Sequence, residues 1–249
     1  MLKKFFAEFL ATAVLVLLGC GTAMALTLAG QDGTAGSVVA IAGAFGFSIL
    51  ILAYTVGQIS GGHANPAVSF AKALTKEITW KEFGIYCGAQ VLGAFFGSLL
   101  LAMVMWSWGT GVSGANAIGD VMKAAGERAG GDFMVYMLST MAEMGMTFLF
   151  VFCVLGVTSK KEWSHIAGIV IALALFGVHL VGIRLTGTSV NPARALSALV
   201  FSMFNGQDVG VKALTLIPTI VGPFMGAFAA ASAFNAFFKK DKKEENKAE

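Results

Sequence analysis

Two copies of the tripeptide Asn-Pro-Ala are the residues of this chain whose types and spacing suggest a chemical role. They are Asn65, Pro66 and Ala67, followed by Asn191, Pro192 and Ala193. Proline suits the first turn of a helix, because the N–H that it lacks would have no partner there. Asparagine suits the position before it, because its side-chain oxygen accepts from free N–H groups of the first turn. Each copy therefore predicts a helix N-terminus that presents an amide donor and roughly half a positive charge.

Donors placed in this way bind a polar molecule and do not transform it. A water held by its oxygen between two such N-termini points its hydrogens outward, so cations are repelled and proton hopping is interrupted. Acceptors would come from the backbone carbonyls of two extended stretches, which are Gly61, Gly62, His63 and Ala64 and then Gly187, Thr188, Ser189 and Val190. The His63 side chain fits a lining role and a packing role equally well.

Catalytic chemistry has no comparable signature in the sequence. We find no nucleophile with a neighbouring base, no cluster of metal ligands and no phosphate-binding loop. We therefore predict that the protein is not an enzyme and needs neither a metal nor a cofactor. The three cysteines, Cys20, Cys87 and Cys153, fall in apolar segments without a CxxC pair, which is typical of small buried side chains.

The composition indicates that these motifs are surrounded by a lipid bilayer. Hydrophobic residues make up 57% of the chain and charged residues only 12%, against about 25% charged residues in soluble domains. A spanning helix needs roughly 20 mostly apolar residues. Six stretches qualify, at 5–28, 38–58, 83–106, 133–157, 164–183 and 212–238. A lipoprotein signal ending at Cys20 is an alternative for the first stretch, which Glu8 and the later spans disfavour. We predict an all-α membrane protein.

The two halves of the chain resemble each other. The segment AEFLATAVLVLLG at 7–19 is similar to AEMGMTFLFVFCVLG at 142–156, and ISGGHANPAV at 59–68 is similar to LTGTSVNPAR at 185–194. Each half has three spans, and three is odd, so the second half enters the membrane from the opposite side. This predicts an inverted repeat. Its parts are a first repeat at 1–106, a connecting outer loop at 107–132, a second repeat at 133–238 and a solvated tail at 239–249.

Each tripeptide opens a helix too short to cross the bilayer. The predicted half-helices cover 66–75 and 192–203, or roughly 15–18 Å each, which is half of a hydrocarbon core of about 30 Å. Two that enter from opposite faces would meet end to end. Non-helical backbone at that depth persists only where it is buried in protein or lines a water-filled cavity. A surface turn would explain one copy, but two matched copies favour a pore.

With its six spans, inverted repeat and paired motifs, the sequence resembles the aquaporins, the major intrinsic protein family. The resemblance implies a passive water channel with one pore per subunit, a homotetramer, and exclusion of protons and ions by half-helix dipoles and an arginine. It also implies an outer selectivity filter and two buried acids that brace the half-helix loops. The filter positions are Phe45, His179, Thr188 and Arg194, and the bracing acids are Glu8 and Glu143.

The residue types at the filter favour water as the solute. Phe45 would form an apolar wall, His179 would add a donor and bulk, and Arg194 would add fixed donors and a positive charge. Glycerol channels of the family carry small residues in place of the histidine and an acidic residue where this chain has Ala195. The stretch before the last VGP matches neither subfamily. A facilitator of glycerol, hydrogen peroxide or ammonia stays open as an alternative, as does a coupled transporter.

The basic residues predict the orientation in the membrane. With six spans both termini lie on one side, and this side holds 12 of the 17 lysines and arginines. The other five are Lys123, Arg128, Arg184, Arg194 and Lys212. By the positive-inside rule both termini are cytoplasmic. We expect a multi-pass protein of the cell membrane, prokaryotic in origin, whose partners are water and lipid and not nucleic acid.

Overall fold

A computed structural model describes residues 1–106, 114–203 and 214–238. Its helices are α1 (Leu2–Leu28), α2 (Ala35–Tyr54), α3 (Gly57–Ser60), α4 (Pro66–Leu74), α5 (Trp80–Trp106), α6 (Asp120–Ala129), α7 (Asp132–Thr158), η1 (Lys161–Trp163), α8 (Ser164–Thr186), α9 (Pro192–Met203), η2 (Ile217–Val221) and α11 (Gly222–Phe238). Predictions on 107–113, 204–213 and 239–249, including the solvated tail, lie outside the described residues.

Six helical segments of the described chain are long and apolar enough to cross a membrane. They are α1, α2, α5, α7, the run from η1 through α8, and the run from η2 through α11. The predicted set of six spans is thereby confirmed. The longest of them, α1, α5 and α7, have 27 residues each, which corresponds to about 40 Å of helix.

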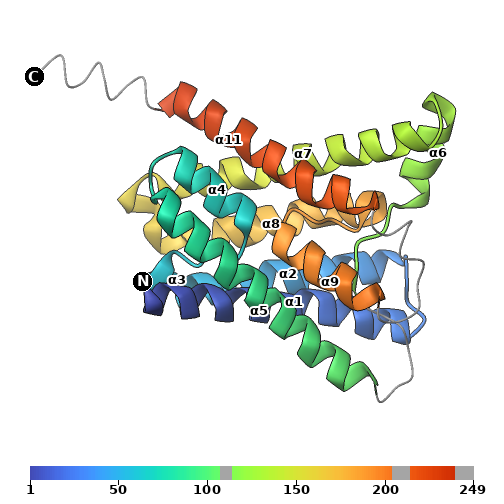
Figure 1. Ribbon diagram of the computed structural model, residues 1–249, viewed down its shortest axis with the longest axis horizontal. Coiled ribbons are helices and arrows are strands. Elements are labelled where there is room, and N and C mark those ends of the chain that lie inside the picture. The colour runs from blue at the N-terminus through green and yellow to red at the C-terminus, as the bar shows by residue number, and fades with distance from the viewer. Residues whose placement is uncertain (107–113, 204–213, 239–249) are drawn as a thin grey trace, which may run out of the picture.

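Two short helices, α4 and α9, begin at the prolines of the paired motifs. They lie in opposite halves of the bundle and point their N-termini toward its centre (Figure 1). Helix α9 begins at the predicted residue and is described as far as Met203, and α4 ends at Leu74, one residue earlier than predicted. At 9 and 12 residues they measure about 14 and 18 Å, too little to cross a bilayer. The described residues therefore form the predicted bundle of spans and half-helices with inverted repeats.

Equivalent glycines bring the first and third span of each repeat into backbone contact. A Cβ at Gly93 on α5 would lie 2.1 Å from the carbonyl oxygen of Phe9 on α1. In the second repeat, a Cβ at Gly226 on α11 would lie 2.3 Å from the carbonyl oxygen of Met144 on α7. Neither position leaves room for a side chain, which is how small residues allow close helix packing in membranes.

The segment between the repeats is not the plain loop that the sequence predicts. Helix α6 occupies Asp120–Ala129 and packs against α7, where Gly126 leaves no room for a Cβ beside Val135. Its first turn carries Asp120 and its last turn Arg128, so both charges complement the helix dipole. The glycines that flank this stretch suggested a loop, but they mark the two ends of a helix.

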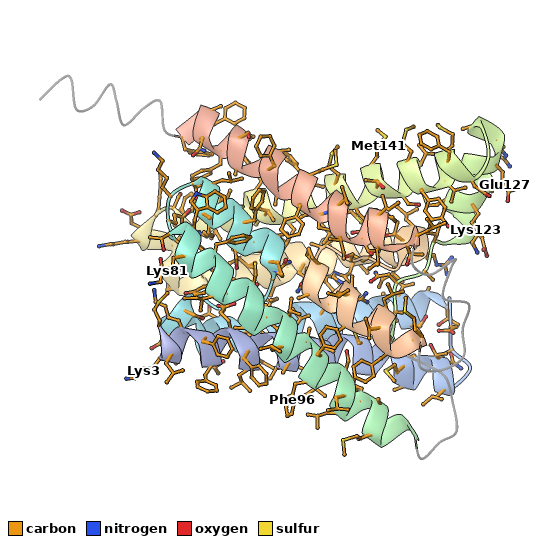
Figure 2. The ribbon with its side chains drawn as sticks, in the orientation of Figure 1. Lys3, Lys81, Phe96, Lys123, Glu127 and Met141 are labelled. Atoms are coloured by element: carbon orange, nitrogen blue, oxygen red, sulfur yellow. The ribbon has the colours of Figure 1, made fainter. Side chains whose placement is uncertain are left out.

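The two ends of the bundle differ in charge. The N-terminus of α1 and the end of α11 lie at the same end of the molecule (Figure 1). Lys3 and Lys81 project there, whereas Lys123 and Glu127 project from α6 at the opposite end (Figure 2). The first described helix therefore begins, and the last one ends, on the same side, as an even number of spans requires.

Candidate pore

The two asparagines cap their half-helices as the sequence predicts. Asn65 has extended backbone, and its Oδ1 accepts from the N–H of Ala67 at 2.8 Å. The Oδ1 of Asn191 accepts from the N–H of Ala193 at 3.1 Å and of Arg194 at 3.3 Å. Both side chains are almost fully buried. The caps thus place two amide groups at the centre of the bundle, where the positive ends of two helix dipoles meet.

The amide nitrogens bind the opposite repeat. Nδ2 of Asn65 donates to the carbonyl of Val190 at 2.8 Å, and Nδ2 of Asn191 donates to the carbonyl of Ala64 at 2.7 Å. An amide NH2 carries two hydrogens, so one remains on each asparagine for a solute. The carbonyls of Ala64 and Val190 therefore bind protein amides, although the sequence predicts them as acceptors for the solute.

Two buried carboxylates hold the loops that lead to the caps. Glu8 accepts from the N–H groups of His63 at 2.9 Å and Ala64 at 2.8 Å. Glu143 accepts from the matching N–H groups of Ser189 at 2.7 Å and Val190 at 2.9 Å. A hydroxyl just before each loop adds a further bond, from Ser60 to Glu8 and from Thr186 to Glu143. The same brace is thus built twice.

These braces hold strained backbone. Ala64 and Val190 have φ values of 49° and 52°, a left-handed conformation that is rare for non-glycine residues and unfavourable for β-branched valine. Such strain costs on the order of 1–3 kcal/mol per residue and persists only where the surroundings fix it. The carboxylates supply that constraint, and the strained backbone turns each carbonyl toward the opposite asparagine.

The first repeat adds a polar network that has no counterpart among the described residues of the second. Gln90 donates to Glu8 at 2.7 Å and to the Ser69 hydroxyl at 2.9 Å, and Ser69 pairs with Nδ1 of His63 at 3.0 Å. His63 is thus held by its own half-helix and also borders the cavities described below. Both roles that the sequence left open apply to this histidine.

Three of the predicted filter residues, Phe45, His179 and Arg194, come together between α2, α8 and the start of α9, and the fourth, Thr188, has its Oγ1 beside Gly182 on α8. The rings of Phe45 and His179 stack with centroids 4.3 Å apart, and the Arg194 guanidinium carbon lies 5.2 Å from the Phe45 ring centroid. His179 Nδ1 lies 2.9 Å from the Leu175 carbonyl, which can only accept. The proton therefore sits on Nδ1, and Nε2 of the neutral ring is an acceptor, where the sequence predicts a donor.

Three polar atoms of the filter lack a protein partner. Among the described residues, His179 Nε2, Thr188 Oγ1 and Arg194 Nε are buried and make no hydrogen bond. Buried polar atoms in proteins are rarely left in this state. One acceptor, one hydroxyl and one cationic donor thus remain for a small polar molecule.

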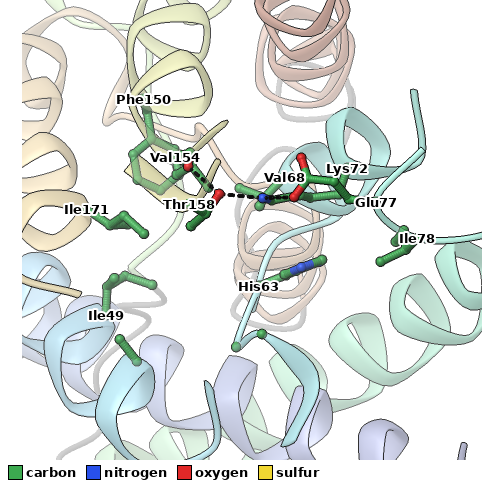
Figure 3. A pocket seen from close by; sticks show the side chains of 13 residues that line it. Ile49, His63, Val68, Lys72, Glu77, Ile78, Phe150, Val154, Thr158 and Ile171 are labelled. Atoms are coloured by element: carbon green, nitrogen blue, oxygen red, sulfur yellow. Dashed lines mark hydrogen bonds and ion pairs between the residues drawn. The ribbon is translucent and has the colours of Figure 1, made fainter. Parts of the chain in front are cut away.

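Two cavities lie along the axis through these residues. The inner one measures about 10 Å³ and is bordered by Phe45, His179, Asn65 and Asn191 among others. A buried water needs roughly 10–15 Å³ of such space. The second, hereafter the vestibule, measures about 250 Å³ and opens beside His63 (Figure 3). Both cavities share His63 and two other lining residues, so they lie next to each other.

The vestibule corresponds to the filter in the other repeat. Shifting the four filter positions by the 126 residues between Asn65 and Asn191 gives Ile171, Ala53, Gly62 and Val68. All four line the vestibule. Small and apolar side chains there take the place of a histidine, a threonine and an arginine. The repeat symmetry thus explains why only one side of the path is constricted.

The sequence does not predict the buried ion pair at the edge of the vestibule. The Lys72 ammonium is almost fully buried and lies 2.5 Å from both the Glu77 carboxylate and the Thr158 hydroxyl (Figure 3). Burial lowers the pKa of Lys72, and Glu77 opposes this shift. Lys72 lies on a half-helix whose other residues are mostly apolar. Its contact with Thr158 on α7 can be identified only from the tertiary structure.

Asn116 was also missed by sequence reasoning. Its Oδ1 accepts from Nη1 of Arg194, and its side chain is buried. The residue belongs to the segment between the repeats, where no motif or spacing marks it.

The remaining polar clusters offer no metal centre within the part of the chain that the structure describes, since no three His, Cys, Asp or Glu residues are grouped there.

Known proteins are similar to this chain in sequence and in fold. The family described as Major intrinsic protein matches residues 1–234. An aquaporin Z of Rhodopseudomonas palustris is 34% identical over 225 residues, 90% of each chain. An aquaporin Z of Brucella melitensis is 34% identical over 241 residues, which are 97% of this chain and all of that protein. The solved aquaglyceroporin from Plasmodium falciparum has a TM-score of 0.79 at 20% identity, over 95% of this chain and 96% of that one, which shows a common fold.

Proposed function

Because the chain belongs to the major intrinsic protein family, we propose that it is a passive channel that conducts water across a membrane. The observation that carries this proposal is the stack of Phe45 on His179 beside Arg194. These three bulky side chains occupy the narrow part of the path. The 34% identical relatives named aquaporin Z also support water as the permeant.

Size is the first basis of the proposed selectivity. The inner cavity of about 10 Å³ is close to the space that one water needs. Glycerol has six heavy atoms where water has one, so it would have to displace the Phe45–His179 stack. His179 Nε2 accepts one hydrogen of a passing water, and Arg194 donates to its oxygen. A single file of waters satisfies both groups.

Charge is the second basis. The positive charge of the Arg194 guanidinium repels cations that approach from its side. The N-termini of α4 and α9 add partial positive charges at Asn65 and Asn191. Both asparagines can donate to one water oxygen, which turns its hydrogens away from the centre and interrupts a proton wire. Ions and protons are thereby excluded while water passes.

A facilitator of glycerol or another small neutral solute is the second candidate. The wide vestibule favours it, because about 250 Å³ accommodates more than water. The solved aquaglyceroporin named above shares the fold, although at 20% identity its name carries no selectivity over to this chain. In this alternative the Phe45–His179 stack would have to open for the solute.

Swelling of proteoliposomes in osmotic gradients of sucrose and of glycerol separates the two candidates. We expect fast water flow and slow glycerol flow in the wild type, and faster glycerol flow in His179→Gly. Ala53→Gly is the matched control, because Ala53 is the vestibule counterpart of His179. Wild-type glycerol flow as fast as water flow would reject the water channel in favour of the facilitator.

We propose the cell membrane as the site of action, with both termini cytoplasmic. The supporting observations are the bacterial relatives and the lysines, such as Lys3 and Lys81, at the end that holds the N-terminus. We also propose a homotetramer, on the basis of family membership. Crosslinking of the protein in native membranes tests the assembly, and labelling of a cysteine added at the N-terminus tests the orientation.

A further inference from the structure

We propose that Asn116 is a positioning residue that holds the Arg194 guanidinium in the filter and so contributes to solute selectivity. The inference rests on the proposed channel function. Asn116 stands outside both repeats, 78 residues before Arg194 in the chain. It would make the connecting segment a part of the filter.

The backbone around Asn116 is fixed against the second repeat. The N–H of Gly119 donates to the Leu185 carbonyl at 2.8 Å. Gly187 lies so close that a Cβ there would be 3.0 Å from the N of Ala117. On the other side, a Cβ at Gly114 would lie 2.9 Å from Cβ of Cys20 on α1. Close contacts on two sides thus hold the short stretch that carries Asn116.

The Asn116 side chain joins the filter to the brace of the second repeat. Its Oδ1 accepts from Nη1 of Arg194, and its Nδ2 lies 3.5 Å from the Thr186 carbonyl as a weak donor. The Thr186 hydroxyl in turn donates to Glu143. One continuous chain of polar contacts therefore runs from the carboxylate that shapes the loop to the guanidinium that shapes the filter.

The other contacts of Arg194 restrain the direction of its guanidinium less than the bond to Asn116 does. The backbone N–H bonds to the cap oxygen of Asn191, which fixes the main chain only. The guanidinium packs against the face of the Phe45 ring, but this contact does not fix how the guanidinium is oriented parallel to the ring. Nε has no partner among the described residues. The guanidinium also contacts the Cys20 thiol on α1, whose sulfur is only a weak acceptor. The bond to the Asn116 amide oxygen is thus the stronger directional contact of the guanidinium tip among the described residues.

A neutral acceptor is the suitable partner for this purpose. Asn116 holds the guanidinium without cancelling its charge, so size exclusion and cation exclusion act together. A carboxylate at the same place would hold the arginine at least as firmly, because charge-assisted bonds are the stronger ones. It would also neutralise the positive charge at the filter. The two kinds of exclusion can therefore be separated by substitution.

The test measures water, glycerol and methylammonium flux in proteoliposomes containing the full-length protein. For Asn116→Ala we expect the ratio of glycerol to water permeability to rise about tenfold, as for the loss of one hydrogen bond to a charged group. For Asn116→Asp we expect the wild-type ratio but a higher methylammonium flux. Asn116→Ser, whose hydroxyl is too short to reach the guanidinium, replaces the alanine variant if that does not fold. Lys123→Ala, an exposed change in the same segment, is the control.

A double substitution shows whether Asn116 acts through Arg194. In an Arg194→Ala background, Asn116→Ala should change the ratio no further. An equal effect in both backgrounds, or folded Asn116→Ala and Asn116→Ser variants with the wild-type ratio, would overturn the inference and leave the channel function intact. A wild type that conducts no water would instead reject the channel function and this inference with it.

Discussion

Asn65 and Asn191 each donate to the backbone carbonyl that precedes the other. The two bonds, of 2.8 and 2.7 Å, connect residues more than 120 positions apart. They join the two repeats at the centre of the molecule in equivalent ways. Each side chain also caps its own half-helix. One amide group thus has two roles in the fold, since its oxygen caps the half-helix and one hydrogen joins the repeats, and the other hydrogen would serve the proposed solute.

Asn191→Ala should therefore lower the stability of the protein more than the removal of an N-cap at the surface does. Loss of a cap costs about 1 kcal/mol, and an unsatisfied buried carbonyl at Ala64 adds about 1–3 kcal/mol. We expect a lower thermal unfolding temperature in detergent, with a similar drop for Asn65→Ala, whose lost bond leaves Val190 unsatisfied. The control is Thr34→Ala, which removes an exposed N-cap on α2. Equal effects at Thr34 and at the paired asparagines would contradict the double role.

Replacement of either bracing acid by its amide should weaken the loop that it holds. In Glu143→Gln an NH2 group would face the N–H of Ser189 or Val190, so a buried donor loses its acceptor at a cost of about 1–3 kcal/mol. Glu8→Gln should behave alike. We expect lower water permeability and faster hydrogen exchange at 187–190 or 61–64 respectively. Glu127→Gln, an exposed change on α6, is the control, and unchanged exchange in the loops would reject the bracing role.

The ion pair at the vestibule should respond unequally to loss of its two partners. The Lys72 side chain is 7% exposed and that of Glu77 is 37% exposed. Glu77→Gln leaves a buried ammonium unpaired, whereas Lys72→Met leaves a carboxylate that water can reach. We expect Glu77→Gln to lower the unfolding temperature more, by the equivalent of about 1–3 kcal/mol.

The pH dependence of the same variant gives a second measurement. Burial lowers the pKa of Lys72, so the unfolded chain binds more protons than the folded one between the folded and unfolded pKa values. Stability should therefore rise with pH across that alkaline interval. For Glu77→Gln, which loses the opposing carboxylate, we expect a steeper rise over the pH range just below the ordinary pKa of lysine than in the wild type. A flat profile would show that the ammonium is not buried as described.

Two alanine substitutions on one helix should differ sharply in their effect on the stability of the protein. Gly93→Ala would place a Cβ 2.1 Å from the Phe9 carbonyl oxygen, whereas Gly84→Ala on the same helix α5 meets nothing within 4 Å. The first must push α1 and α5 apart, and overpacking of this kind costs about 1–3 kcal/mol. The second should be neutral or slightly stabilising. Comparison of their unfolding temperatures in one detergent decides the point, and equal values would contradict the close contact.

Much of the fold follows from local patterns in the sequence. Six apolar stretches of sufficient length specify six spans, because the thickness of the bilayer sets the length of a spanning helix. Asn-Pro-Ala specifies a cap and a first turn through the preferences of these residues alone. The recurrence of the motif after an odd number of spans specifies the inverted repeat. Phe45 and His179 could be named as neighbours only through the family resemblance.

Other features depend on contacts that no spacing encodes. Asn116 reaches Arg194, and Lys72 reaches Thr158, because separate helices pack at particular angles. The acceptor role of His179 depends on where the Leu175 carbonyl points, and the cross-bonds of the asparagines on strained backbone at Ala64 and Val190. The sequence alone therefore determined which segments cross the membrane and where the half-helices begin. Only the tertiary structure decided which polar atoms are already paired and which remain for a solute, because a hydrogen bond requires distance and direction between atoms from separate parts of the chain.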